Sequence, residues 1–289
     1  MRALASFYDG LKGTVWVAER NGAVVGMIAA IPLPEDTWEI CQVYVHPSLH
    51  GSGLGHELLD IAEHHARSAA RFSLWTDTRF ERAHRFYEKR SYIRSGPIRA
   101  LNDISNSLEF HYEKPRDGIA VLDIAAAESA IPRLSYLLIE CVAEGAGVSF
   151  LPPLAPERAR DFWKATARDV AARRKILLAG WVDGVLAGTV TLSIATPENQ
   201  PHRAEVAKLL VDPAFRRHGL ARRLMARLEQ EALNAGRPLL MLDTRAGDRA
   251  EALYRSMGWH ELGLVPGHAA AKDGTFEDTF FFWKRVDQT

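Results

Sequence analysis

A short basic turn that contains a glycine is where the sequence most clearly offers chemistry. The turn, Arg216–Ala221, reads RRHGLA and joins an apolar segment, Glu205–Val211, to a helical pattern of leucines that runs to Asn234. A strand that turns sharply into a helix presents free backbone N–H groups, which together with the helix dipole bind an anion such as phosphate. Gly219 would let the backbone approach that ligand closely. An ordinary connection with surface arginines fits the same residues, so the rest of the chain must decide.

Composition limits the kind of protein that carries this turn. The 289 residues are 47% hydrophobic and 25% charged, which is typical of a globular chain of two ordinary domains. Lys plus Arg and Asp plus Glu both number 36, so no net field favours nucleic acid or an anionic membrane as a partner. No apolar run is long enough to span a bilayer, and the first residues lack the apolar core of a signal peptide. Cys41 and Cys141 give no disulfide framework, so we expect a cytoplasmic protein, and no ligand spacing indicates a metal site.

The chain contains one pattern twice. Glu39 and Glu205 open matching apolar segments, and the offset between the two copies stays constant through the glycine turn and beyond it. The matching pairs are Trp38–Pro47 with Ala204–Pro213, His50–Gly55 with Arg216–Ala221, Asp77–Arg79 with Asp243–Arg245, and, after one inserted residue, Ala83–Tyr87 with Ala250–Tyr254. Two independent copies of one pattern argue against chance and indicate a duplicated domain.

Each copy needs the same elements to hold its turn in place. A hairpin comes before it, at Thr14–Leu33 and at Lys175–Ala195, and each hairpin carries a two-residue type I′ turn signal, Asn21-Gly22 or Asp183-Gly184. A central strand, the glycine turn, a helix, a second strand, a short helix that contains a tyrosine, and closing strands follow in both copies. The closing strands are expected at Ser107–Lys114 and Thr279–Arg285.

This order, with R-x-x-G-x-A between the central strand and the helix, resembles the GNAT N-acetyltransferases over nearly the whole chain. The resemblance implies an α/β (α+β) protein of two GNAT-type domains, 1–116 and 117–289, joined by the polar linker Lys114–Gly118. Each domain would be a mixed, mostly antiparallel twisted sheet with flanking helices and a central helix after the pyrophosphate-binding turn. The resemblance also implies acetyl-CoA as cosubstrate and an amine as acceptor.

The two copies differ before their hairpins. The second copy predicts a strand at Ile119–Ile124, a helix at Ser129–Ala143, a loop at Glu144–Ala155 and a helix at Pro156–Arg174. The first copy has only Met1–Gly13 there, so we expect it to lack its N-terminal strand and helix, which form much of the acceptor wall in the family. The domain is shortened, or the second domain or a partner chain supplies the wall, or the native start lies upstream.

Acetyl-CoA would lie along the central strand and the turn of each copy. In the family the backbone of that strand pairs with the pantetheine arm, and the turn holds the pyrophosphate. The residues implied are Leu209, Leu210, Val211, Arg216, Arg217, His218, Gly219, Leu220 and Ala221 in the second copy, and Val43, Tyr44, Val45, His50, Gly51, Ser52, Gly53, Leu54 and Gly55 in the first. His50 stands where the family has Arg or Gln, so we expect weak binding, or binding without efficient turnover, in the first copy; two working sites are the alternative.

A carboxylate opens the central strand of each copy. A primary amine with a pKa of about 10.4 is mostly protonated at neutral pH, so acetyl transfer to it needs a base. Glu205 is the candidate, because a charge at the start of an apolar strand is costly unless paired; a salt bridge with Arg203 or Lys208 is the alternative. Asp243 follows the predicted strand Pro238–Leu242 and could bind the amine or assist the base, or it could cap the next helical segment.

A tyrosine, Tyr254, lies in the predicted helix Arg249–Met257, four residues before Gly258. In the family a tyrosine at this place lies near the sulfur of CoA, which makes Tyr254 the candidate acid, although packing in the core is the commoner role of a single tyrosine. Tyr87 matches it in the first copy, where Ser91 replaces the usual glycine.

The second copy resembles one branch of the family more closely, the tabtoxin-resistance acetyltransferases. The segments HRAEVAKLLV, LDTRAG and VPGHAAAKDG and the loop Gly145–Phe150 carry this likeness. It implies a small amine or amino-acid-like acceptor, and it puts the catalytic carboxylates at Glu205 and Asp243. We therefore expect direct acetyl transfer mainly in the second domain. An acyl-CoA-binding sensor or scaffold without efficient turnover is the alternative, and a homodimer is left open.

Overall fold

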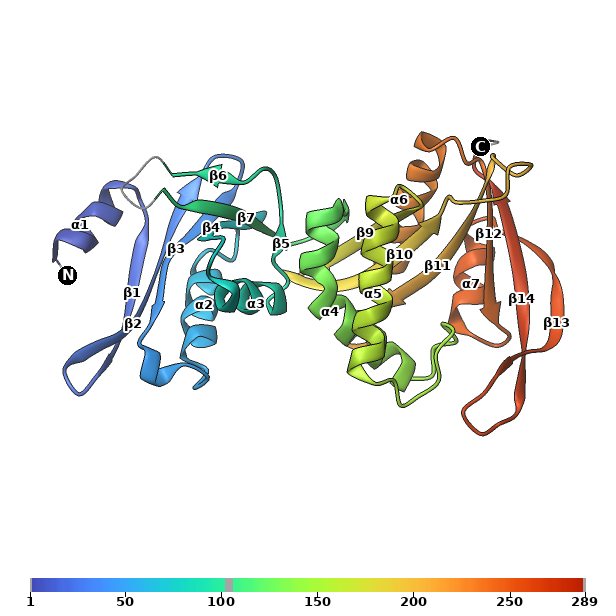
Figure 1. Ribbon diagram of the computed structural model, residues 1–289, viewed down its shortest axis with the longest axis horizontal. Coiled ribbons are helices and arrows are strands. Elements are labelled where there is room, and N and C mark those ends of the chain that lie inside the picture. The colour runs from blue at the N-terminus through green and yellow to red at the C-terminus, as the bar shows by residue number, and fades with distance from the viewer. Residues whose placement is uncertain (1, 102–105, 288–289) are drawn as a thin grey trace. The chain divides into compact units, whose positions relative to one another are not determined.

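The structure is a computed structural model that describes residues 2–101 and 106–287. The chain divides into two compact units, the first made of Met1–Tyr87 and Tyr92–Asp117, the second of Glu88–Ser91 and Gly118–Thr289. In Figure 1 the first unit runs from blue to green and the second from green to red, and each consists of one sheet with helices beside it. The main division, at Asp117, falls inside the predicted linker.

The first unit is built on a seven-stranded mixed sheet. Its strands are β1 (Thr14–Arg20), β2 (Ala23–Leu33), β3 (Thr37–Val45), β4 (Arg71–Asp77), β5 (Ile93–Arg94), β6 (Arg99–Ala100) and β7 (Leu108–Pro115), and its helices are α1 (Arg2–Gly10), the 3₁₀ turn η1 (Pro47–Leu49), α2 (Leu54–His65) and α3 (Glu81–Lys89). The strand order is β1-β2-β3-β4-β7-β5, and β6 also pairs with β7. Within the described residues β3 and β4 are parallel and the other pairs are antiparallel.

The second unit repeats this plan and extends it at one edge. Its strands are β8 (Gly118–Val121), β9 (Lys175–Val182), β10 (Val185–Ser193), β11 (Arg203–Val211), β12 (Leu239–Arg245), β13 (His260–Ala270) and β14 (Phe276–Arg285), and its helices are α4 (Ile124–Ala143), α5 (Pro156–Ala171), the 3₁₀ turn η2 (Pro213–Phe215), α6 (Leu220–Asn234) and α7 (Arg249–Ser256). The order is β13-β14-β12-β11-β10-β9-β8, with β11 and β12 the parallel pair among the described strands. The mixed, mostly antiparallel sheets expected from the sequence are confirmed.

Local sequence explains both hairpin turns and the close packing of the central helix on the sheet. Asn21 and Gly22 both have positive φ angles, of 53° and 75°, as the predicted type I′ turn requires, and the matching turn in the second unit has the same geometry. Helix α6 buries one apolar face, formed by Leu220, Leu224, Met225 and Leu228. A Cβ added to Gly180 would lie only 2.7 Å from Leu220 Cδ1, so the absence of a side chain on β9 lets the helix pack closely on the sheet.

The predicted start of the second unit was wrong in one respect. The strand β8 ends at Val121 rather than at Ile124, and α4 begins at Ile124, five residues before the predicted helix at Ser129. Asp123 is the reason, because its carboxylate accepts a hydrogen bond of 2.8 Å from the Ala126 N–H and caps the helix. The first unit has α1 alone before its hairpin, whereas the second has β8, α4 and α5.

Candidate active site

The central strand of the second unit parts from its parallel neighbour at Glu205. Parallel pairing between β11 and β12 joins only residues 203–205 to residues 239–241. Beyond them β11 continues to Val211 beside β10, and β12 continues to Arg245 beside β14. In the described part of the chain, the facing edges of the two strands therefore form no ladder past this point. Polar backbone groups need partners, so an extended ligand can pair with such an edge.

A β-bulge lies on β11 directly after this separation. The register between β10 and β11 shifts between Thr189 and Thr191, and Lys208 has a φ of 54°. The first unit has the same irregularity in β3, where Gln42 has a φ of 53°. A bulge turns the strand and re-aims its backbone groups. Neither bulge residue is glycine, and a positive φ is uncommon for other residues, so the sequence carried no signal for this feature.

The basic turn has the predicted geometry at the start of α6. Gly219 is the N-cap residue, with a φ of 72°, and no side chain caps the helix. A Cβ added to Gly219 would meet no atom within 4 Å, so the space above the helix N-terminus is open. Arg217 and His218 are exposed, and the Arg216 guanidinium lies 3.7 Å from the Glu144 carboxylate. Uncapped N–H groups at a helix N-terminus and nearby arginines are groups that can bind an anion.

The strand residues expected to meet the cofactor lie between the bulge and the turn. Leu210 is buried in the core, and Leu209 and Val211 are half-buried, so their side chains hold the strand on the core. One backbone edge of this part of β11 pairs with β10, and the other edge is the one that has separated from β12. Leu220 is buried and Ala221 half-buried at the start of α6. Strand, bulge and turn thus form one continuous stretch of backbone.

Glu205 occupies the point where the strands part, but it is not buried. Its side chain is 58% exposed, and its carboxylate forms an ion pair with the Arg203 guanidinium. The salt bridge considered as an alternative is therefore present, and its partner is Arg203 rather than Lys208. An exposed ion pair of this kind holds its members weakly, and the catalytic role of Glu205 stays a prediction.

Asp243 lies inside β12 rather than at its end, and it is exposed. The capping role is wrong, because the N-cap of α7 is Asp248, whose carboxylate accepts a hydrogen bond of 2.9 Å from the Ala250 N–H. The Asp243 carboxylate makes no hydrogen bond or ion pair with any residue that the structure describes. It is therefore available to bind a cation.

Tyr254 is buried against Trp259 and Phe282, at ring-centre distances of 6.0 and 5.9 Å. Burial, with smaller contributions from the nearby carboxylates Asp248 and Asp243, raises the pKa of its phenol. Its hydroxyl forms no hydrogen bond within the described residues. The phenol is therefore neutral near pH 7 and free to donate a hydrogen bond.

The loop that the sequence places near the acceptor lies across this site. Glu144 contacts Arg216 of the turn, as given above. Ser149 Oγ lies 3.4 Å from the Lys208 ammonium at the bulge. A Cβ added to Gly147 would lie 3.2 Å from the Cβ of Arg245, the last residue of β12. The loop thus runs from the anion-binding turn past the end of the neighbouring strand to the bulge.

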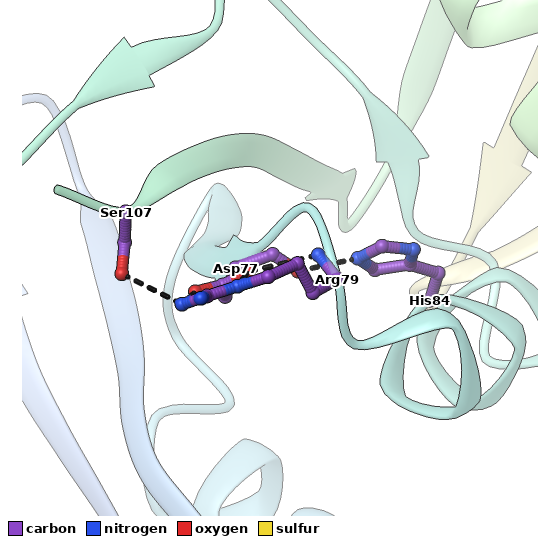
Figure 2. A network of polar contacts seen from close by, with 4 residues as sticks. All are labelled: Asp77, Arg79, His84 and Ser107. Atoms are coloured by element: carbon purple, nitrogen blue, oxygen red, sulfur yellow. Dashed lines mark hydrogen bonds and ion pairs between the residues drawn. The ribbon is translucent and has the colours of Figure 1, made fainter. Parts of the chain in front are cut away.

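The matching aspartate of the first unit, Asp77, is hydrogen-bonded to Arg79. The Asp77 carboxylate accepts hydrogen bonds from the Arg79 backbone N–H at 2.8 Å and from Arg79 Nε at 2.9 Å. Figure 2 shows this network, in which Arg79 also donates to Ser107 Oγ at 3.1 Å and His84 Nε2 lies 2.9 Å from the Asp77 carbonyl oxygen. The Arg79 side chain, and then its backbone N–H, hold the pKa of Asp77 well below its usual range. In the second unit Arg245 instead pairs with Glu277, at 3.2 Å.

The matching glutamate of the first unit lies in a more enclosed place than Glu205. Glu39 is half-buried, and burial raises its pKa, although the charge of Arg99 opposes this effect. Tyr8, from α1, is buried, and burial together with Cys41 raises the pKa of Tyr8 to about 12. Tyr8 therefore interacts with Cys41 of β3, two residues along the strand from the carboxylate that corresponds to the candidate base.

The glycine turn of the first unit keeps its shape but changes its charge. Gly53 is the N-cap residue of α2, with a φ of 95° and no side-chain cap. Both ring nitrogens of His50 have neighbours, because Nε2 lies 3.0 Å from the Val45 carbonyl oxygen and Nδ1 lies 3.0 Å from Arg82 Nη1. The cation beside this turn is therefore Arg82, which the sequence did not single out. Of the other expected residues, Tyr44, Gly51 and Ser52 are exposed, and Val43, Val45, Leu54 and Gly55 are half-buried.

Comparison with known proteins places this geometry in a family. The model of the acetyltransferase (GNAT) family matches residues 2–92 and 143–259, which together make up more than half of the chain. The chain belongs to the GNAT acetyltransferase family. The first match covers the turn of the first unit and the second covers the turn of the second, so both copies of the pattern are GNAT regions.

Individual relatives of this GNAT protein agree with that assignment. An uncharacterized N-acetyltransferase of Azospirillum brasilense, from the hisH-hisA intergenic region, is 35% identical over 114 residues, 39% of this chain and 66% of the relative. An N-acetyltransferase of Staphylococcus aureus shares the fold, with a TM-score of 0.50 and 17% identity over 59% of this chain and 98% of its own. yncA of Salmonella typhimurium, solved with its cofactor acetyl-CoA, has a TM-score of 0.50 and 18% identity over 60% of this chain and 95% of its own.

Metal sites and membrane-spanning helices are the other features of interest. Among the described residues no group of three or more His, Cys, Asp or Glu side chains is placed to hold a metal ion. No described helix combines the length and apolarity that crossing a membrane requires.

Proposed function

We propose that this chain is an acetyl-CoA-dependent N-acetyltransferase whose second unit transfers acetyl directly to the amine of a small or amino-acid-like acceptor. The observation that carries the proposal is the separation of β11 from β12 at Glu205, followed on the same strand by a bulge and an uncapped helix N-terminus. An anion site, an open strand edge and a carboxylate thus follow one another along one stretch of backbone. The family and the acetyl-CoA bound to yncA support acetyl-CoA as the donor.

Acetyl-CoA binding would use backbone groups more than side chains. The pyrophosphate would accept hydrogen bonds from the N–H groups of the turn at Gly219, with Arg216 and Arg217 adding charge. The pantetheine arm would pair with the edge of Leu209–Val211. The thioester carbonyl would then lie by the bulge, where a backbone N–H can stabilise the oxyanion that forms during transfer.

Proton transfer would fall to the carboxylates near the bulge. Glu205, directly or through water, removes a proton from the acceptor ammonium, and Asp243 holds that ammonium in place. The amine attacks the thioester carbon, and the nitrogen gives up its second proton to solvent water. The C–S bond breaks, and CoA leaves as a thiolate that accepts a hydrogen bond from Tyr254. Burial makes this phenol a weaker acid than a thiol of pKa about 8.5, so Tyr254 stabilises the thiolate without fully protonating it.

The test of this function is amine-dependent release of CoA. Full-length protein is incubated with acetyl-CoA and a panel of small amines and amino acids, free thiol is followed over time, and N-acetylated product is identified by mass spectrometry. We expect release that requires an amine and is lost in Gly219→Glu. Amine-independent release, or none with any amine, contradicts the proposal.

A second function is favoured by the first unit alone. Asp77 is bound by Arg79 and so is not available to an acceptor, and the turn His50–Gly55 contains no arginine. This unit could therefore hold acyl-CoA as a sensor or scaffold without turnover. Acetyl-CoA binding without acceptor-dependent release, across the same panel, would support that function for the whole chain. Light scattering after size exclusion tests the homodimer that the sequence leaves open.

A further inference from the structure

Lys208 places a partly enclosed positive charge at the bulge. Its side chain is half-buried, and its ammonium lies 5.4 Å from the centre of the Phe162 ring, 5.8 Å from that of Phe150 and 3.4 Å from Ser149 Oγ. In the described part of the chain no carboxylate forms an ion pair with it. Removing an ammonium from water without an anionic partner is costly, and contacts with ring faces offset only part of that cost.

The surroundings of Lys208 favour an added anion. Burial lowers the pKa of its ammonium, Asp243 opposes this effect by its charge, and Lys175 adds to it. A second cation, Arg158, lies 5.9 Å from the Phe150 ring centre. The Ser149 hydroxyl can donate to an anion beside the ammonium. The surroundings of Lys208 thus offer positive charge, a hydroxyl donor and two aromatic faces next to the open strand edge.

We propose that Lys208, together with Ser149, binds a carboxylate on the acceptor, so that the substrates are amines carrying a carboxylate near the amino group. This inference rests on the proposed function. Asp243, near enough to act on Lys208 by charge yet unpaired with it, would hold the acceptor ammonium while Lys208 holds its carboxylate. Phe150 and Phe162 would contact the apolar part of the acceptor. The first unit has Gln42 at the matching position and lacks this charge.

Paired substrates test the proposal through the acid-to-ester ratio. Each free amino acid is compared with its methyl ester, which keeps the amine and removes the carboxylate, and kcat/KM is measured for wild type and Lys208→Gln. We expect wild type to favour the acids and Lys208→Gln to lower that preference by about 10- to 100-fold, the usual value of a hydrogen bond to a charged group. The lower amine pKa of the esters affects both proteins alike and cancels in the comparison.

Matched variants separate charge from structure. Lys208→Arg keeps the cation and should restore part of the preference, whereas Lys164→Gln, on the exposed face of α5, should leave it unchanged. The Kd for acetyl-CoA should be the same in all of these proteins. An unchanged acid-to-ester ratio in Lys208→Gln overturns the proposal, even when transfer to amines proceeds and the proposed function stands.

A measurement without turnover separates the two ideas. Lys208 is labelled with an amine-reactive reagent in the full-length protein, and labelling is followed by peptide mass spectrometry in the presence of N-acetylated amino acids or their methyl esters. The acids should slow labelling of Lys208 at least several-fold more than the esters do. Protection by the acids without any acetyl transfer would keep the carboxylate site and overturn the transferase. Equal labelling with acids and esters would overturn the carboxylate site.

Discussion

The two units carry the same Asp-Thr-Arg segment at the same place and use it differently. In the first unit Arg79 folds back onto Asp77 and donates hydrogen bonds to both of its carboxylate oxygens. In the second unit Arg245 pairs with Glu277 instead and leaves Asp243 exposed. The glutamates differ in the same sense, since Glu39 is half-buried and Glu205 is exposed. The same Asp-Thr-Arg segment thus forms an internal ion pair in the first unit and leaves its aspartate exposed in the second.

Of the substitutions that distinguish the two units, Glu205→Gln should lower kcat the most. Loss of a general base lowers kcat by about 10²–10⁴, whereas Glu39→Gln should leave the rate of acetyl transfer within about twofold. Steady-state kinetics with thiol detection measures both. Arg203→Met is the matched control, because it breaks the ion pair and keeps the carboxylate. Equal losses in Glu205→Gln and Arg203→Met would assign Glu205 to that ion pair and not to proton transfer.

Asp243→Asn should have the next largest effect. Loss of the charge that holds the acceptor ammonium should lower kcat/KM by about 10- to 100-fold, with the change mainly in KM. Asp77→Asn should leave kcat/KM unchanged and instead lower the denaturant midpoint of the first unit, because it weakens the bonds to Arg79. A loss of activity in Asp77→Asn larger than in Asp243→Asn would reverse the roles of the two units.

Tyr254→Phe should reduce kcat by about tenfold or less. A thiolate leaves readily, and the phenol contributes one hydrogen bond to it. Because this hydroxyl has no partner among the described residues, the unfolding midpoint should stay the same. Tyr87→Phe should change neither quantity. A loss as large as that of Glu205→Gln would make proton donation the limiting step and contradict the role given to Tyr254.

The pH dependence of the unfolding free energy should show the contribution of the Asp77–Arg79 ion pair directly. The pKa of Asp77 is lowered in the folded state, so its contribution is complete above the pKa of the unfolded chain, about 3.9, and is lost as the pH falls toward the folded value. Denaturant unfolding between pH 5 and pH 2 should therefore show a decline that Asp77→Asn makes shallower. A decline that is equally steep in Asp77→Asn and in wild type would contradict this contribution of Asp77.

The sequence predicted features that depend on glycine or on repetition. Both hairpin turns, the start of α6 directly after Gly219 and the apolar face of α6 are as expected, because few residues fit those positions. The bulge at Lys208 was not predictable, since lysine is not a residue type that favours the positive φ found there. The partner of Arg245 lies 32 residues away in sequence, so only the folded chain shows why Asp243 is open and Asp77 is bound.

Isothermal titration with acetyl-CoA tests most directly whether the second unit is the site of catalysis. Wild type is compared with Gly219→Glu and Gly53→Glu, which place a bulky negative side chain over each helix N-terminus. Gly219→Ala and Gly53→Ala are matched controls for the backbone strain that any side chain meets at these positive φ angles. We expect the second unit to bind acetyl-CoA more tightly than the first, so Gly219→Glu should abolish this tight binding and Gly53→Glu should retain it. Loss of the tight site in Gly53→Glu, with wild-type binding in Gly219→Glu, would contradict the account.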